Sequence, residues 1–243
     1  MRDFVSSWVE DNQEGLIHVS DKVWEFAELG LLERESAAVS QEYLVSQGFS
    51  IESGVANMET AFVATWGSGK PVIGFLGEYD ALPGVSNAPV PHPSPLGRDT
   101  PGHGCGHNLL GAAAIGGAVA LKAFAEANDL KCTVKYYGTP AEESSFGKTW
   151  MVKAGVFSDA DIVLTWHPGN SNGTGKSSNL ADLVYKFDFY GKTSHAAGDP
   201  HNGRSALDGV ELMNAGIERM REHMRPENRV HYVITHGGGA PNV

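Results

Sequence analysis

The chain has 243 residues, of which 41% are hydrophobic and 19% charged, a composition that suits a folded core and excludes wholesale disorder. Acidic residues outnumber basic ones by 29 to 18, which gives a formal net charge of −11. Nucleic acid is therefore not an expected partner, because its phosphates would be repelled. The two cysteines, Cys105 and Cys132, are too few for a disulfide framework and favour a cytoplasmic location.

The first third of the chain predicts two helices and then two strands. Apolar residues at helical spacing indicate a helix over 4–29, and a second helix is expected to follow Ser36 as its N-cap and to end before Gly48. Strands are expected over 61–66 and 71–76. The second strand runs into the acidic sequence GEYD, which is typical of a buried strand whose carboxyl end opens into a site.

The middle of the chain alternates helices and strands. A proline-rich loop over 87–101 leads into the sequence GHGCGHN and a helix to about residue 127. Strands over 132–137 and 161–166 enclose a short helix over 147–154. This alternation favours an α/β fold, with a mostly parallel sheet flanked by helices.

Neither a leader nor a membrane span is expected. Residues 1–12 carry acids and lack an apolar core segment, so they do not resemble a signal peptide. The longest apolar run, 109–121, consists mostly of Gly and Ala and falls short of the roughly 20 residues that cross a bilayer. We interpret this run as part of a buried core helix, and no membrane partner is expected.

A Ser/Gly/Asn-rich stretch over 170–179 predicts a domain boundary, which divides the chain into residues 1–178 and 179–243. The second part has its own alternating and helical patterns. They predict a strand, a helix and another strand over 180–190, 205–223 and 230–235, the beginning of an α+β domain.

Possible metal ligands lie at the ends of successive predicted elements. Cys105 and His107 precede a helix, Glu142 and Glu143 follow one strand, and His167 follows another. Thiolate, imidazole and carboxylate are the usual ligands of zinc-like metals, and α/β sheets gather their sites at strand ends. Each cluster alone has an ordinary structural explanation, but together they predict a metal site. The adjacent glutamates suggest one ligand and one free general base.

Two other hydrolytic sites remain as alternatives. Residues 169–173 fit the Gly-x-Ser-x-Gly nucleophile elbow, although no helical pattern follows them. Cys105 beside a histidine could act as a thiol nucleophile, but this would leave the two glutamates and His167 without a role. We therefore interpret residues 169–173 as a chance match in a linker, and Cys105 as part of a metal site.

Several motifs occur in order along essentially the whole chain: GEYDALPG, GHGCGHN, PAEE, TWHP and SHAAGDPHNGRSALD. Together they resemble the aminoacylase and carboxypeptidase-G-like metallopeptidase family, in its amidohydrolase branch with a Cys-Gly-His motif. Within that branch the chain is most similar to the aminobenzoyl-glutamate utilization proteins and related dipeptidases. The resemblance implies a catalytic domain with two divalent metal ions, Zn or Mn, and an inserted α+β lid domain that forms a homodimer.

By matched position, the resemblance also implies roles for residues of the catalytic domain. Glu142 is the general base, and Asp80 orients a ligand. In other branches a His ligand stands two residues before this Asp, where the present chain has Glu78. The metal ligands implied are Cys105, His107, Glu143 and His167.

In the lid, the resemblance implies that His195 reaches the neighbouring subunit's site and stabilises an oxyanion. Asn242 is expected to contact substrate, and Arg204 to bind its carboxylate. The family's final His ligand and the rest of the lid find no match, so we expect the lid to be incomplete. The expected activity is hydrolysis of the amide bond of an N-acyl amino acid, p-aminobenzoyl-glutamate or a small dipeptide. The alternative is a truncated, inactive fragment that serves as a binding or assembly module.

Overall fold

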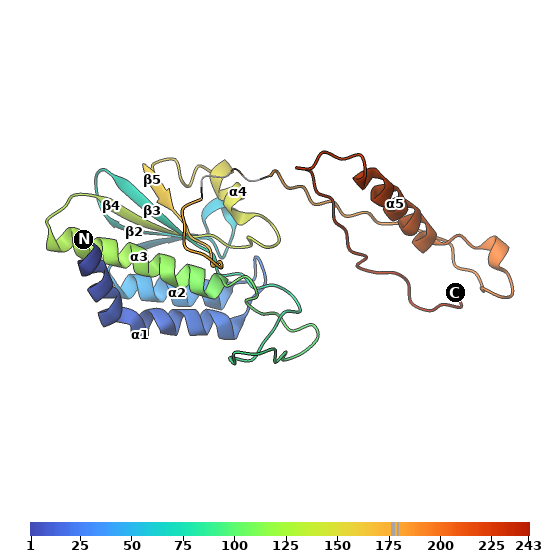
Figure 1. Cartoon of the computed structure of the whole chain (residues 1–243), viewed down its shortest axis with the longest axis horizontal. Coiled ribbons are helices and arrows are strands. Elements are labelled where there is room, and N and C mark those ends of the chain that lie inside the picture. Colours follow the sequence, from blue (N-terminus) through green and yellow to red (C-terminus); the bar gives the residue numbers. More distant parts are fainter. Residues whose placement is uncertain (176–177, 179) are drawn as a thin grey trace. The chain divides into compact units, whose positions relative to one another are not determined.

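The computed structural model describes residues 1–175, 178 and 180–243 (Figure 1). Its internal contacts separate the chain into two units, residues 1–172 and 173–243, and each unit is described by itself. The predicted boundary stretch includes Lys176, Ser177 and Asn179, which lie outside the described residues.

Unit 1 contains one five-stranded sheet with the order β1-β2-β4-β3-β5. Strand β3 pairs in parallel with β4 and β5, whereas the β1–β2 and β2–β4 pairs are antiparallel. The α/β fold is confirmed, but the sheet is mixed rather than mostly parallel. The cause is the short connection from β2 to β3, which reverses the chain, so β2 runs against β3 and against its parallel partner β4. The strands are β1 (Ser50–Ser53), β2 (Phe62–Gly67), β3 (Val72–Gly77), β4 (Thr133–Gly138) and β5 (Ile162–Leu164).

Three helices lie on one side of this sheet in Figure 1: α1 (Arg2–Phe26), α2 (Arg34–Ser46) and α3 (His107–Ala127). Helix α3 packs on β3 and β4, and α1 packs on α3 and α2. A separate apolar cluster joins the sheet to Met151 of α4 (Gly147–Lys153), next to the 3₁₀ turn Val55–Asn57. The main core between α3 and the sheet includes Phe62, Ile115, Val119, Val134 and Tyr136.

Helix α3 confirms the predicted buried core helix. It is 21 residues long and apolar enough to cross a membrane, yet 61% of its most apolar window is buried inside unit 1. Its small side chains allow close packing, since a Cβ at Gly111 would stand 2.6 Å from the carbonyl oxygen of Glu78. The small side chains therefore allow α3 to lie close to the strand end that carries Glu78.

Helix α2 starts two residues before the predicted N-cap, so that prediction is wrong. Ser36 lies inside the helix, and Glu33 occupies the N-cap position without a capping side-chain hydrogen bond. The reason is Glu28, whose carboxylate accepts hydrogen bonds from the backbone N–H groups of Glu35 (3.1 Å) and Ser36 (2.9 Å). These bonds satisfy first-turn donors that a local cap would otherwise serve.

The described residues of unit 2 form one α-helix, α5 (Ala206–Arg221), and the 3₁₀ turn Pro200–Asn202. The Ser205 side chain caps α5 by accepting a hydrogen bond from the backbone N–H of Asp208 at 3.1 Å. The strands predicted over 180–190 and 230–235 are wrong, because the described residues of unit 2 form no strand. Their apolar side chains are exposed rather than packed on a paired neighbour, as in Tyr185, Phe187 and Val233.

Candidate metal centre

The candidate site forms where strand ends and a helix start meet in unit 1. Since β3, β4 and β5 run in the same direction, the residues that follow them emerge at one edge of the sheet. Glu78 and Asp80 follow β3, Glu142 and Glu143 follow β4, and His167 follows β5. Cys105 and His107 reach the same edge at the beginning of α3, so four segments distant in sequence bring their donor groups together.

Gly106 makes the close approach of these segments possible. Its φ of 84° lies in the left-handed region, and it immediately precedes the first residue of α3. A Cβ at this position would also come within 3.0 Å of the Pro168 side chain. The glycine between Cys105 and His107 therefore permits both the turn into the helix and the contact with the loop that carries His167.

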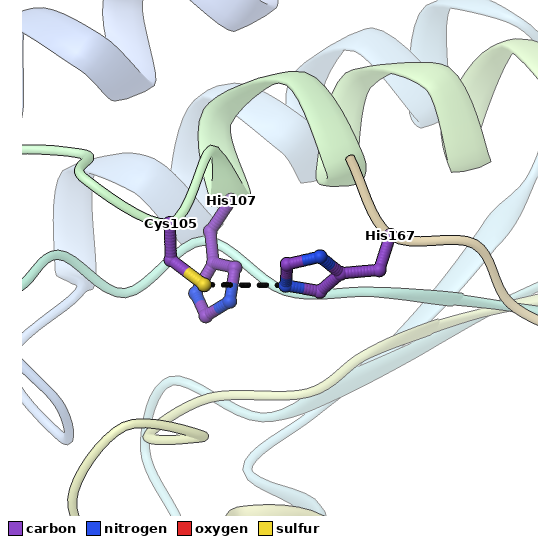
Figure 2. A group of neighbouring side chains, drawn as sticks. All are labelled: Cys105, His107 and His167. Atoms are coloured by element: carbon purple, nitrogen blue, oxygen red, sulfur yellow. Dashed lines mark hydrogen bonds between the residues drawn. The ribbon is translucent and has the colours of Figure 1, made fainter. Parts of the chain in front are cut away.

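Cys105, His107 and His167 form one potential metal-binding group (Figure 2), with donor atoms all within 4.8 Å of one another. The Sγ of Cys105 lies 3.2 Å from Nε2 of His167. The other ring nitrogen of His167 lies 2.9 Å from the Pro168 carbonyl oxygen, which turns Nε2 toward the cysteine. His107 is fully buried, whereas His167 is exposed and leaves the site open to solvent.

Asp80 orients His107. Its Oδ1 lies 3.0 Å from Nδ1 of His107, and its Oδ2 accepts a hydrogen bond from the backbone N–H of Glu143 at 2.9 Å. This contact favours the tautomer with a proton on Nδ1, and Nε2 is then the atom available to a cation. The resemblance implied an orienting role for Asp80, and that role stays a prediction.

A second potential metal-binding group consists of Glu78, His107 and Glu142. The Oε2 of Glu78 lies 2.9 Å from Nε2 of His107, and Glu142 and Glu143 each place an oxygen 3.9 Å from that nitrogen. The sequence did not single out Glu78 as a ligand. The available signal was its place two residues before Asp80 at the end of a buried strand.

Burial and neighbouring charges strongly shift the pKa values of the side chains in this cluster. Burial opposes the charge on His107, but the adjacent carboxylates of Asp80 and Glu78 outweigh it and raise the pKa of His107 to about 10. Burial likewise disfavours the charge on Glu78, yet the neighbouring His107 and Lys148 lower its pKa to about 2. For the Cys105 thiol, burial together with the neighbouring Glu143 raises the pKa to about 11. The pKa of Glu142 is raised by burial and by the charge of Glu78.

The residues present fit divalent cations. Three buried polar atoms at the centre of the cluster have no hydrogen-bond partner: Oε2 of Glu78, Nε2 of His107 and Oε1 of Glu143. Buried polar atoms without partners are costly and require an explanation. All three are good metal donors, and a cation would remove both the cost and the mutual repulsion of the carboxylates.

Other histidines and the lid residues lie elsewhere. His103 is buried against α1, with Nε2 2.9 Å from the Val23 carbonyl oxygen, and it belongs to neither metal-binding group. In unit 2, Nδ1 of the exposed His195 accepts a hydrogen bond from the backbone N–H of Gly198 at 3.0 Å. The next residue, Ala196, donates its backbone N–H to the Asn242 carbonyl oxygen at 3.2 Å. The structure thus brings His195 and Asn242 close in unit 2, where the exposed Arg204 pairs through its backbone with Lys192.

The serine-nucleophile alternative receives no structural support. The Gly-x-Ser-x-Gly stretch over 169–173 is followed by irregular chain at residues 174, 175, 178 and 180, so these described residues form no helix directly after the stretch, as a nucleophile elbow requires. Cys105 faces His167, but burial and the charges of three nearby carboxylates hold the pKa of the thiol high, which disfavours a thiolate nucleophile.

Comparison with known proteins gives a family match and several relatives. Residues 74–241 match the family model described as peptidase family M20/M25/M40. The chain is 43% identical over 242 residues to one of the subunits of p-aminobenzoyl-glutamate hydrolase from Escherichia coli, covering 99% of this chain and 50% of that protein. It is 35% identical over 195 residues to a mouse Xaa-Arg dipeptidase, covering 76% and 41% of the two chains.

Among solved structures, a Bacillus subtilis protein described as a dinuclear metal-binding peptidase of the M20 family has a similar fold. The TM-score is 0.51 at 24% identity, covering 63% of this chain and 42% of that chain. The present chain spans about half the length of the curated relatives described above.

Proposed function

The chain belongs to peptidase family M20/M25/M40, and from this premise we propose that it contributes the metal-binding part of an amidohydrolase. The proposed substrates are an N-acyl amino acid, p-aminobenzoyl-glutamate or a small dipeptide. The observation that carries the proposal is the convergence of a thiol, two imidazoles and three carboxylates around buried donor atoms that lack hydrogen-bond partners. The names of the two relatives, a p-aminobenzoyl-glutamate hydrolase and a dipeptidase, support the substrate class.

The proposed cofactor is a pair of divalent ions, Zn or Mn. Cys105, His107, Glu143 and His167 would hold them, a set in which thiolate and imidazole suit zinc and the carboxylate also suits manganese. When bound, such ions act as Lewis acids that polarise the amide carbonyl and favour ionisation of the attacking water. The description of the Bacillus subtilis protein as dinuclear supports the number of ions.

Glu142 is the proposed general base. Its side chain is 39% exposed, so a carboxylate oxygen can reach both solvent and a substrate at the mouth of the site. Burial and the charge of Glu78 raise the pKa of Glu142, which improves it as an acceptor of the water proton and as a later donor to the leaving amine. Asp80 holds His107 and the backbone of Glu143 in place, so it is a positioning residue for this chemistry.

The roles of unit 2 belong to the same proposal. His195 would donate a hydrogen bond to the oxyanion in the site of a second protomer, while Arg204 and Asn242 would bind the substrate. A homodimer formed through residues 179–243 follows from these roles. Both cysteines are free thiols, which supports a reducing, cytoplasmic location.

The test pairs elemental analysis of the purified chain with hydrolysis of p-aminobenzoyl-glutamate under added Zn²⁺ or Mn²⁺. The Glu142→Ala variant should keep its metal and lose turnover by about 10²–10⁴-fold, because it removes the proton acceptor and leaves the proposed ligands in place. Glu59→Ala is the matched control, since Glu59 is 68% exposed in an ion pair with Arg34.

Retained turnover in Glu142→Ala would refute its role as base. A folded chain with no metal and no turnover would instead support an inactive binding or assembly module.

A further inference from the structure

Glu78 is a buried carboxylate with one free oxygen. The residue is 6% exposed, and its Oε1 accepts a hydrogen bond from Nζ of Lys148 at 2.5 Å. Its Oε2 is also buried but has no hydrogen-bond partner. If Glu78 served only as an ion-pair partner of Lys148, its second oxygen would be expected to find a donor, because an unpaired buried carboxylate oxygen is costly.

The free oxygen of Glu78 lies beside a ring nitrogen of His107 that also has no hydrogen-bond partner. Oε2 of Glu78 lies 2.9 Å from Nε2 of His107, which also lacks a hydrogen-bond partner because the two groups are misaligned for such a bond. With metal–ligand bonds of roughly 2.0–2.2 Å, two donors of one cation lie roughly 3–3.5 Å apart, the shorter value at a right angle and the longer at the tetrahedral angle. The observed spacing of 2.9 Å is at the short end of this range, so one cation can bind both atoms.

The number of ligand atoms available for two metal ions also favours a role for Glu78. His107 appears in both potential metal-binding groups, but its Nδ1 is engaged by Asp80. The single lone pair on Nε2 can bind only one ion. One of two ions must therefore rely more heavily on carboxylates.

Resting on the proposed function, we propose that Glu78 is a further metal ligand through Oε2, with Lys148 fixing Oε1 from the start of α4. Cys105 and His167 then belong mainly to one ion, and Glu78 and Glu142 lie beside the other. Lys148 is a positioning residue, because it holds the carboxylate in the rotamer that presents Oε2 to His107 and Glu142. The chain would thus use a glutamate at the place where other branches of the family are expected to have a histidine.

The test is titration of metal-free protein with Co²⁺, followed by visible absorption. The thiolate of Cys105 should give a sulfur-to-cobalt charge-transfer band that reports its ion independently of Glu78. Wild type should bind two equivalents. Glu78→Gln and Glu78→Asp should both keep the sulfur band and bind the second equivalent at least about ten-fold more weakly. Glu59→Gln is the control and should match wild type, because Glu59 is an exposed carboxylate on another surface.

The aspartate variant separates coordination from charge, since it keeps the negative charge but shortens the side chain by one methylene. Second-ion affinity equal to wild type in Glu78→Asp would overturn the inference, whatever Glu78→Gln does, and would leave the proposed function intact. No Co²⁺ binding and no sulfur band in wild type would overturn the proposed function together with the inference.

If a variant fails to fold by circular dichroism, crystals of the wild-type protein grown with Co²⁺ provide an independent test through anomalous diffraction at the cobalt edge. A cobalt peak roughly 2.0–2.2 Å from Oε2 of Glu78 supports the inference, and a bound pair of ions without that contact overturns it.

Discussion

Replacement of Glu33 by alanine should destabilise unit 1 and disturb the loop that carries the proposed base. The Glu33 side chain is fully buried and accepts hydrogen bonds from the backbone N–H of Ala141 at 2.7 Å and from the Thr60 hydroxyl at 2.9 Å. Ala141 has a φ of 56°, in the left-handed region that alanine rarely adopts, and it immediately precedes Glu142. The Glu33 carboxylate therefore holds a strained backbone next to the site.

The magnitude follows from the two hydrogen bonds. Each bond to a charged acceptor contributes about 1.5–3 kcal/mol, and the alanine variant leaves the buried Ala141 N–H without a partner. Burial of the ionised carboxylate offsets part of this gain, because desolvation raises the pKa of Glu33. We expect Glu33→Ala to lose about 2–4 kcal/mol of unfolding free energy. Glu33→Gln can keep both contacts by accepting from Ala141 and donating to Thr60, so its loss should stay below about 1.5 kcal/mol.

Guanidinium unfolding of both variants and wild type at neutral pH measures these values. A Glu33→Ala variant within about 1 kcal/mol of wild type would refute the reasoning.

The pH dependence of the unfolding free energy provides a second test of Glu33, and the direction of the change can be predicted. Burial raises the pKa of Glu33 above 4.5 in the folded chain, so the folded state binds more protons than the unfolded state between 4.5 and the raised value. The contribution of this group to stability must then fall as the pH rises through that window, and it is restored as the pH falls to 4.5. The stability of Glu33→Gln relative to wild type should therefore increase over the same rise in pH, and a constant difference would contradict a buried, titrating Glu33.

Two further substitutions test local conformations. Gly106→Ala should cost about 1–2 kcal/mol of unfolding free energy, because alanine is disfavoured at a φ of 84° and its Cβ would press on Pro168; a denaturation midpoint equal to wild type would contradict this. Ser205→Ala should destabilise α5 by about 1 kcal/mol through loss of the hydrogen bond from Asp208, seen as an earlier loss of helical circular dichroism on heating, with the exposed Ser7→Ala as control.

Much of unit 1 could be predicted from the sequence because its patterns are local. The alternating and continuous apolar runs place β2 and β3 within one residue of the observed Phe62–Gly67 and Val72–Gly77. The small-residue helix and the Cys-Gly-His turn before it also agree with the structure, since a glycine between Cys105 and His107 is required by the observed turn. The sequence also predicted that the possible metal ligands lie close together. Parallel strands end at the same edge of a sheet, and this depends on topology rather than on exact contacts.

Pairing partners and long-range caps could not be predicted in the same way. Alternation in residues 180–190 indicates a half-buried face, but a strand also needs a neighbour to complete its backbone hydrogen bonds, and the described part of unit 2 offers none. The start of α2 depends on Glu28, which lies outside the helix and bonds to its first turn. Glu33 similarly acts on Ala141, more than a hundred residues away. No local pattern encodes these contacts.

Asp80 shows how the fold fixes the relation between the proposed ligands and the proposed base. Its Oδ1 meets the His107 ring at the start of α3, and its Oδ2 accepts a hydrogen bond from the Glu143 backbone in the loop after β4. One buried carboxylate at the end of β3 thus positions a ligand from a helix and the loop that carries Glu142. Functional groups must be held to about 0.5 Å of their working geometry. The proposed activity therefore requires that both segments are held by the same strand end. The neighbouring Glu78 could not hold them in this way, because its oxygens face Lys148 and the site itself.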